Sequence, residues 1–116
     1  MDANEFKHFG RLNDPDASAH IKGVCGDEME FYLVFNNEVI TDVRFYTEGC
    51  GYTGICGETA ARLSAGKHID DAMGLSPAMV IKEINDLPED HVHCSILATM
   101  TLLKALADYL YRKSIT

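Results

Sequence analysis

Alternating apolar and polar positions predict strands in the first half of the chain. Residues 28–35 are rich in aromatic and β-branched types, and residues 19–24 predict a shorter strand. Between residues 28–35 and 38–47, Asn36-Asn37 favours a tight turn, because Asn tolerates a positive φ angle. Residues 38–47 predict a strand with one buried side, and that side would carry Val39, Thr41, Val43, Phe45 and Thr47.

Helical spacing of apolar residues dominates the second half. Residues 53–65 predict a helix that ends at Gly66, residues 70–75 a further turn, and Ser76-Pro77 the start of a helix over residues 77–86. The clearest pattern runs from about His91 to Lys113. Its apolar stripe consists of Ile96, Met100, Leu103, Ala107 and Leu110, widened by Leu97, Leu106 and Tyr111.

The order of these elements predicts the fold class. We expect an α+β protein with a three-stranded antiparallel sheet packed against four to five helices, the last of them long. Residues 2–9 predict a short helix, and residues 10–18 a loop. A length of 116 residues allows one domain, so we expect residues 1–116 to form a single unit.

Composition excludes several classes of protein. Hydrophobic residues make up 47% and charged residues 24%, which is ordinary for a soluble globular domain. No apolar run approaches the ~20 residues of a membrane helix, and the N-terminus lacks the pattern of a secretory signal. Ten basic and 18 acidic residues give a net charge of −8, which disfavours nucleic acid and anionic membranes as partners. We therefore expect a cytoplasmic protein.

Four cysteines provide the candidate chemistry. In a reducing compartment they should be free thiols, and the absence of a CxxC pair excludes zinc-ribbon and thioredoxin motifs. In an antiparallel meander the first and third strands end at the same edge of the sheet, so Cys25 and Cys50 should be neighbours. If the intervening helices run down and back, the last helix begins at this edge with Cys94 in its first turn.

The residues around these thiols favour a metal site. Cys25 and Cys50 are each flanked by glycines, which let the backbone approach a bulky ligand, and Cys94 would lie at a helix N-terminus. Asp27 and His93 add an oxygen and an imidazole, so the set suits a soft metal. Cysteine also packs often as a small hydrophobe, but three thiols at one end of a domain favour the metal site.

Three motifs in this order resemble a known family. The segments Val24–Asp27, Phe45–Gly51 and His93–Ala98, the last preceded by Leu87-Pro88, are similar to those of IscU/NifU-type iron–sulfur cluster assembly scaffolds. The similarity extends from about Phe6 to Tyr109.

The resemblance implies a function and a ligand set. Such a scaffold is not an enzyme: it receives sulfur from a cysteine desulfurase, combines it with iron in a labile [2Fe–2S] cluster and passes the cluster to acceptor apo-proteins. The ligands would be Cys25, Cys50 and Cys94, with Asp27 and His93 as ligands or beside them. Zn²⁺ can occupy this site in family members when no cluster is present.

Two departures from the family pattern stand out. Leu87–His91 reads Leu-Pro-Glu-Asp-His where the family has Leu-Pro-Pro-Val-Lys, which makes recognition by the Hsp70-type chaperone doubtful. Cys56 replaces a small hydroxyl residue; it is a further candidate ligand, although a packing role is favoured. As sulfur acceptor we expect Cys94, because a helix N-terminus and His93 should stabilise its thiolate.

Two other functions remain open from the sequence. One is a zinc-bound sulfur acceptor, in which a single thiolate takes persulfide sulfur. The other is a small interaction protein with a structural zinc ion. Reconstitution with iron and sulfide separates both from a cluster scaffold.

Overall fold

The computed structural model describes residues 6–115 and contains one antiparallel sheet. Its strands are β1 (Ala17–Lys22), β2 (Glu28–Asn36) and β3 (Val39–Tyr46), in the order β1-β2-β3. β1 begins two residues earlier than predicted. Together with the helices that follow, this sheet confirms the α+β class.

The sheet buries one face. Met29, Phe31 and Leu33 alternate along β2 and are completely buried, while Glu28 and Glu30 lie on the opposite, more open face. This period of two residues is the alternation that the sequence predicted for β2.

A β-bulge changes the pattern in β3. Val34 pairs with Asp42 and Phe35 with Ile40, so Thr41 has no partner in the ladder. Because the extra residue inverts the alternation, Ile40 is buried while Thr41 is exposed. The prediction that Thr41 faces the core is therefore wrong.

The turn between β2 and β3 also lies one residue later than predicted. Asn37 and Glu38 have φ angles of 53° and 67°, the combination that a type I′ turn requires. Glu38 is an unusual residue at such a φ angle. Its carboxylate accepts a hydrogen bond from the Tyr109 hydroxyl at 3.3 Å and pairs with the Lys113 ammonium, and these contacts favour the conformation.

Four α-helices and one 3₁₀ turn complete the described part of the chain. The elements are α1 (Gly51–Ser64), α2 (Ile69–Ala72), α3 (Pro77–Glu83), η2 (Glu89–His91) and α4 (Val92–Ser114). Gly66 has a φ angle of 78° just beyond α1, as a glycine in this position predicts. None of the helices within residues 6–115 combines the length and apolar character needed to cross a bilayer.

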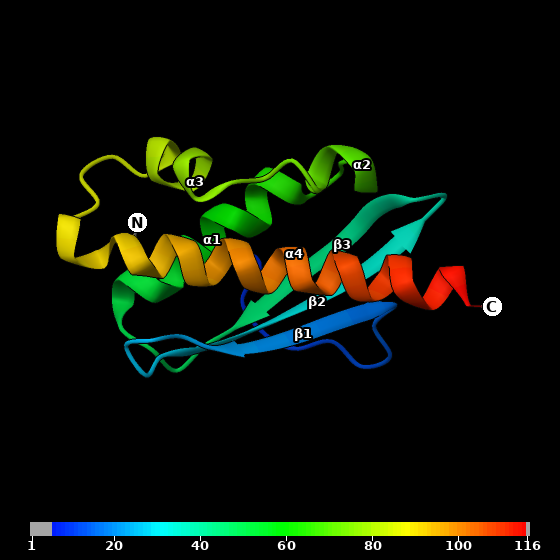
Figure 1. The fold of residues 1–116 in the computed structure, drawn as a ribbon, viewed down its shortest axis with the longest axis horizontal. Helices are drawn as coiled ribbons and strands as arrows, with labels where there is room; N and C mark the ends of the chain where they lie inside the picture. Colours follow the sequence, from blue (N-terminus) through cyan, green and yellow to red (C-terminus); the bar gives the residue numbers. More distant parts are fainter. Residues whose placement is uncertain (1–5, 116) are drawn as a thin grey trace.

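Helices α1 and α4 cover the buried face of the sheet (Figure 1). α4 packs on β1 and β2, and α1 packs on β3 and on α4. The close approach of α1 depends on Gly57, because a Cβ atom there would lie 2.6 Å from the Phe45 ring. This packing fixes the start of α1 relative to the end of β3.

The face of α4 that enters the core differs from the predicted stripe. The exposed set includes Ile96, Met100, Ala107 and Leu110, whereas the buried set is Cys94, Ser95, Leu97, Ala98, Thr99, Thr101, Leu102, Ala105 and Leu106. Small residues let the helix approach the sheet closely. The Thr101 hydroxyl donates to the Leu97 carbonyl at 2.7 Å, so its burial leaves no unsatisfied group.

The N-terminal segment packs without forming the predicted helix. Residues 2–5 of that prediction lie outside the described residues. Phe9 forms a parallel bridge with Phe45, and His8 contacts Glu58 of α1. The buried Glu58 carboxylate accepts hydrogen bonds from the His8 backbone N–H at 2.9 Å and lies 2.8 Å from its ring Nδ1. This pair fastens the segment to α1.

Candidate metal centre

Three segments that are distant in the sequence meet at one end of the molecule. Figure 1 shows the β1–β2 loop, the start of α1 and the start of α4 together at its left end. These segments carry Cys25, Cys50 and Cys94 respectively. The topology that was expected to bring the three cysteines to one edge is therefore present.

The tightest group of metal-binding atoms contains a residue that the sequence analysis did not select. Donor atoms of Cys50, His91 and Cys94 all lie within 4.8 Å of one another. His91 Nδ1 is 3.9 Å from Cys94 Sγ. Because Zn–S and Zn–N bonds are about 2.3 and 2.0 Å long, small side-chain shifts would let these three atoms share one ion.

Neighbouring rings orient His91. The Tyr52 ring packs on the imidazole with centroids 4.3 Å apart, and the centroid of the His93 ring lies 6.0 Å from that of His91. The contact with Tyr52 ties the imidazole to the first turn of α1. His91 is therefore held between the two helices that supply Cys50 and Cys94.

Asp27 reaches this group through Thr53. The buried Thr53 hydroxyl donates to Asp27 Oδ2 at 2.6 Å. The Thr53 hydroxyl oxygen also lies 3.4 Å from Cys50 Sγ and 3.4 Å from Cys94 Sγ. A single hydroxyl thus connects the carboxylate to both thiols.

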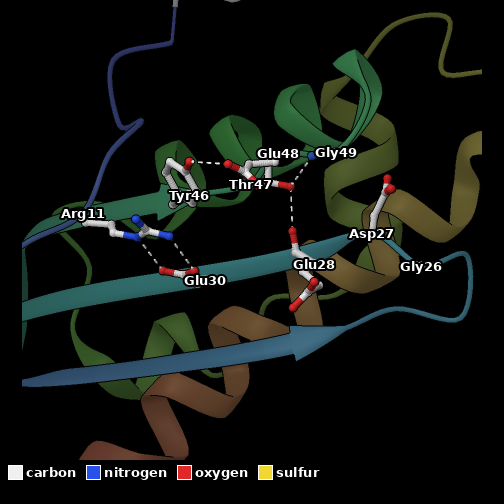
Figure 2. Close-up of a pocket in the computed structure, with 9 residues that line it drawn as sticks. All are labelled: Arg11, Gly26, Asp27, Glu28, Glu30, Tyr46, Thr47, Glu48 and Gly49. Atoms are coloured by element: carbon white, nitrogen blue, oxygen red, sulfur yellow. Dashed lines mark hydrogen bonds and ion pairs between the residues drawn. The ribbon is translucent and has the colours of Figure 1, made fainter.

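The backbone around Asp27 is held by Thr47. Its hydroxyl donates to the Glu28 carbonyl at 2.6 Å and accepts from the Gly49 N–H at 3.0 Å, which joins the end of β3 to the start of β2. Figure 2 shows these bonds, with the Asp27 side chain turned away from that of Glu28. A Cβ atom at position 49 would lie 2.8 Å from Asp27 Oδ2, so the carboxylate needs glycine there.

A polar pocket of about 240 Å³ lies beside Asp27. Its carboxylates are largely engaged: Glu30 forms two hydrogen bonds with Arg11, at 2.9 and 3.1 Å, and Glu48 accepts from the Tyr46 hydroxyl at 3.0 Å. The Arg11 guanidinium also lies 3.9 Å from the centre of the Tyr46 ring. These pairs stiffen the outer face of the sheet next to the site.

Cys25 and His93 lie beside the Cys50–His91–Cys94 group and not in it. They line an apolar groove of about 350 Å³ between the β1–β2 loop and α4, together with Val24, Ile96 and Met100. Cys25 and Val24 are exposed, and neither Cys25 nor His93 belongs to the 4.8 Å group found among the described residues. The structure therefore brings these two predicted residues to the rim and not to the tightest cluster.

The thiols differ in their expected ionisation. Partial burial works to raise the pKa of Cys50, but hydrogen bonds from the backbone N–H groups of Thr53 and Tyr52 hold the pKa below its usual value. Burial raises the pKa of Cys94, and the nearby Cys50 and Cys25 thiols act in the same direction. Cys50 is thus the more readily ionised of the pair.

Cys56 lies behind the centre in α1. It is completely buried, and burial raises the pKa of its thiol to about 12. All four cysteines are free thiols. Such a buried, protonated thiol is typical of a packing residue, which was the favoured interpretation of this position.

His91 and Thr53 were not among the predicted site residues, yet both carry a recognisable signal. His91 precedes Cys94 by three positions and Thr53 follows Cys50 by three. Residues three apart on a helix lie on the same face, so each can reach toward the thiol. His93, two positions from His91, lines the apolar groove with Cys25 instead.

Comparisons with known proteins agree with the fold and with the motifs. The NifU-like N-terminal domain family matches residues 3–116. The chain is 32% identical over 116 residues to the iron–sulfur cluster assembly scaffold protein IscU 1 of Archaeoglobus fulgidus, covering 94% of this chain and 75% of that protein. It is 34% identical over 100 residues to the iron–sulfur cluster assembly scaffold protein IscU of Escherichia coli K12, covering 84% of this chain and 77% of that one.

A solved structure supports the architecture. The crystal structure of the N-terminal part of a NifU-like protein from Brucella abortus superposes with a TM-score of 0.67 at 21% sequence identity, over 95% of this chain and 90% of that one. At this identity the likeness concerns the fold alone. The family match, which covers nearly the whole chain, carries the assignment: this protein belongs to the family of NifU-like N-terminal domains.

Proposed function

We propose that this protein is a scaffold on which an iron–sulfur cluster is assembled and from which it is transferred. The observation that carries the proposal is the group formed by Cys50, His91 and Cys94, whose donor atoms lie within 4.8 Å of one another at the end where Cys25 also lies. Thiolate and imidazole ligands suit iron–sulfur clusters and zinc. The family membership and the names of the relatives agree with this role.

The thiolate ligands in this proposal are Cys25, Cys50 and Cys94. Cys25 is exposed at the β1–β2 loop, so it can move toward the other two when a cluster is built. For the imidazole, the distances favour His91. His93 lines the same groove as Cys25 and is the alternative when Cys25 is a ligand.

The site is suited to temporary binding. Cys25 and Cys50 are exposed, and a set of thiolates mixed with imidazole or carboxylate ligands should hold a cluster less firmly than four thiolates. A carboxylate near the thiolates offers a competing ligand during release, and we assign this role to Asp27. The cluster is therefore cargo, and the expected type is [2Fe–2S].

Without iron and sulfide, we propose that the same atoms bind Zn²⁺. Two thiolates and one imidazole fill three positions of a tetrahedral ion, with the fourth open to water. Such an ion would order the loop and both helix starts.

The sulfur donor in this scheme is a cysteine desulfurase, and the recipients of the cluster are apo-proteins. A thiolate of the scaffold attacks the outer sulfur of the donor persulfide, the S–S bond breaks, and the donor leaves as a thiolate. The sequence favours Cys94 as this nucleophile. The burial of Cys94 and the exposure and lowered pKa of Cys50 favour Cys50 instead, and mass spectrometry after incubation with desulfurase and cysteine discriminates the two.

The chaperone interaction remains doubtful. Glu89–His91 forms the 3₁₀ turn η2 in place of an extended segment, and its two acidic residues differ from the family pattern. We expect a peptide of residues 85–95 to bind an Hsp70-type chaperone weakly. Restoring Pro-Val-Lys at positions 89–91 should strengthen binding. A restored peptide that binds no better would show that these positions are not the determinant.

Anaerobic reconstitution with ferrous iron and sulfide tests the proposed function. The wild type should gain visible charge-transfer absorption from a bound cluster. Cys25→Ser, Cys50→Ser and Cys94→Ser should each lose most of it, whereas Cys56→Ser serves as the matched control and should retain it. A wild type that stays colourless would reject the scaffold role.

A further inference from the structure

The Thr53 hydroxyl uses all of its hydrogen-bonding capacity inside the site. A threonine hydroxyl has one proton and two acceptor lone pairs. The proton is donated to Asp27 Oδ2 at 2.6 Å, and both sulfur atoms, of Cys50 and Cys94, lie at 3.4 Å. Because the proton is committed to the carboxylate, the thiols are the donors in the two contacts with sulfur.

This arrangement separates Asp27 from the sulfur atoms. Its carboxylate oxygens do not belong to the 4.8 Å group that Cys50, His91 and Cys94 form within the described chain. The Thr53 oxygen contacts the carboxylate and both thiols. To share an ion with the two sulfurs, Asp27 has to give up the hydrogen bond from Thr53.

Metal binding changes the balance around this hydroxyl. Cysteine binds a metal as the thiolate, so Cys50 and Cys94 stop donating to Thr53 when they become ligands. The proton of Thr53 then remains as the link to Asp27. Whether this one bond persists decides where the carboxylate stands relative to the metal.

We infer that Thr53 is a positioning residue that keeps the Asp27 carboxylate out of the ligand set and leaves one metal position open to exchange. Asp27 enters that position only when the hydrogen bond from Thr53 is broken. The inference rests on the proposed function for the location of the metal. It adds a control of lability that depends on a side chain which is not itself a ligand.

Anaerobic titration with Co²⁺ alone, in the absence of iron and sulfide, tests the inference. Thr53→Val removes the hydroxyl at nearly constant volume, so Asp27 should become a ligand. We expect Co²⁺ to bind about tenfold more tightly, a scale typical of changes beside a metal site, and the visible d–d bands to shift as a carboxylate oxygen replaces water. Thr53→Ser keeps the hydroxyl and should behave as the wild type.

The double variant Thr53→Val/Asp27→Ala identifies the new ligand. It should lose both the gain in affinity and the shift of the d–d bands, and Asp27→Ala alone should bind Co²⁺ as the wild type does. Equal or weaker binding by Thr53→Val would overturn the inference, and so would a gain that persists without Asp27.

A second variant breaks the same bond without changing Thr53. A Cβ atom at Gly49 would lie 2.8 Å from Asp27 Oδ2, so Gly49→Ala should displace the carboxylate and give the same Asp27-dependent gain. If Thr53→Val fails to fold, Gly49→Ala with and without Asp27→Ala decides the question. An absent gain in Co²⁺ affinity overturns the inference. Because no cluster is formed in these titrations, their outcome is separate from that of the reconstitution.

Discussion

The Nδ1 atom of His91 lies 3.9 Å from the sulfur of Cys94, which follows it by three positions. This contact crosses the junction between η2 and α4, and the Tyr52 ring supports the imidazole from α1. An imidazole fixed at this distance from a thiol, with the Cys50 sulfur within 4.8 Å, is preorganised to bind a metal. The family pattern has lysine at this position, so the imidazole is a property of this chain.

The first prediction separates His91 from His93. His91→Gln should weaken Zn²⁺ binding by at least about tenfold, because it removes a ligand, and loss of a mere supporting partner already has that effect. His93→Gln is the matched control and should bind Zn²⁺ nearly as the wild type does. Competition with a chromophoric chelator measures both. A larger loss in His93→Gln than in His91→Gln would show that His93 is the ligand.

The second prediction concerns cluster release. Asp27→Ala should hold a reconstituted cluster longer than the wild type, because it removes the carboxylate that competes with the thiolate ligands. Glu28→Ala removes the neighbouring exposed carboxylate and should leave the lifetime unchanged. The decay of visible absorption under argon measures the lifetimes. A lifetime for Asp27→Ala equal to or shorter than that of the wild type would count against this role.

The third prediction uses the ionisation of the thiols. Iodoacetamide reacts with thiolates. An ordinary cysteine has a pKa of ~8.5, and at any pH below this value the lowered pKa of Cys50 gives it a larger thiolate fraction. In the metal-free protein at neutral pH, Cys50 should react well before Cys56, whose pKa is raised to about 12 by burial. Peptide mapping by mass spectrometry reads the order. Labelling of Cys56 at the same rate as Cys50 would contradict it.

The fourth prediction concerns the N-terminal segment. His8→Ala should lower the free energy of unfolding by about 1–3 kcal/mol, because it removes a partner of the buried Glu58 carboxylate. His20→Ala breaks the exposed pair with Glu28, whose atoms are 2.7 Å apart, and should change the free energy by less than about 1 kcal/mol. Urea unfolding of the metal-free protein measures both. Equal losses in the two variants would mean that the burial of Glu58 does not matter.

Local sequence patterns predicted the element order but not the details that long-range packing decides. β2 was readable because Met29, Phe31 and Leu33 alternate without interruption. In β3 the bulge at Thr41 inverts the alternation, and a bulge depends on pairing with the neighbouring strand. Along α4, a stripe containing Ile96 and Met100 is as apolar as the face that enters the core, so hydrophobicity alone could not choose between them.

The candidate site was predictable to a similar depth. Strand directions placed the segments of Cys25 and Cys50 at one end, and the expected course of the helices added that of Cys94. The choice between His91 and His93 depends on helical rotation, about 100° per residue, and therefore on where the helix begins. The position of η2 and the start of α4 are set by packing against α1, which the sequence does not display.

Cluster transfer is the most direct test of the central claim. The protein reconstituted with iron and sulfide is mixed anaerobically with an apo-ferredoxin that binds a [2Fe–2S] cluster, and visible circular dichroism follows the cluster. We expect the signal of the scaffold-bound cluster to disappear while the signal of the holo-ferredoxin rises to a matching amount. A protein that binds only isolated metal ions, or a cluster that stays on the chain while the ferredoxin remains apo, would contradict the scaffold role.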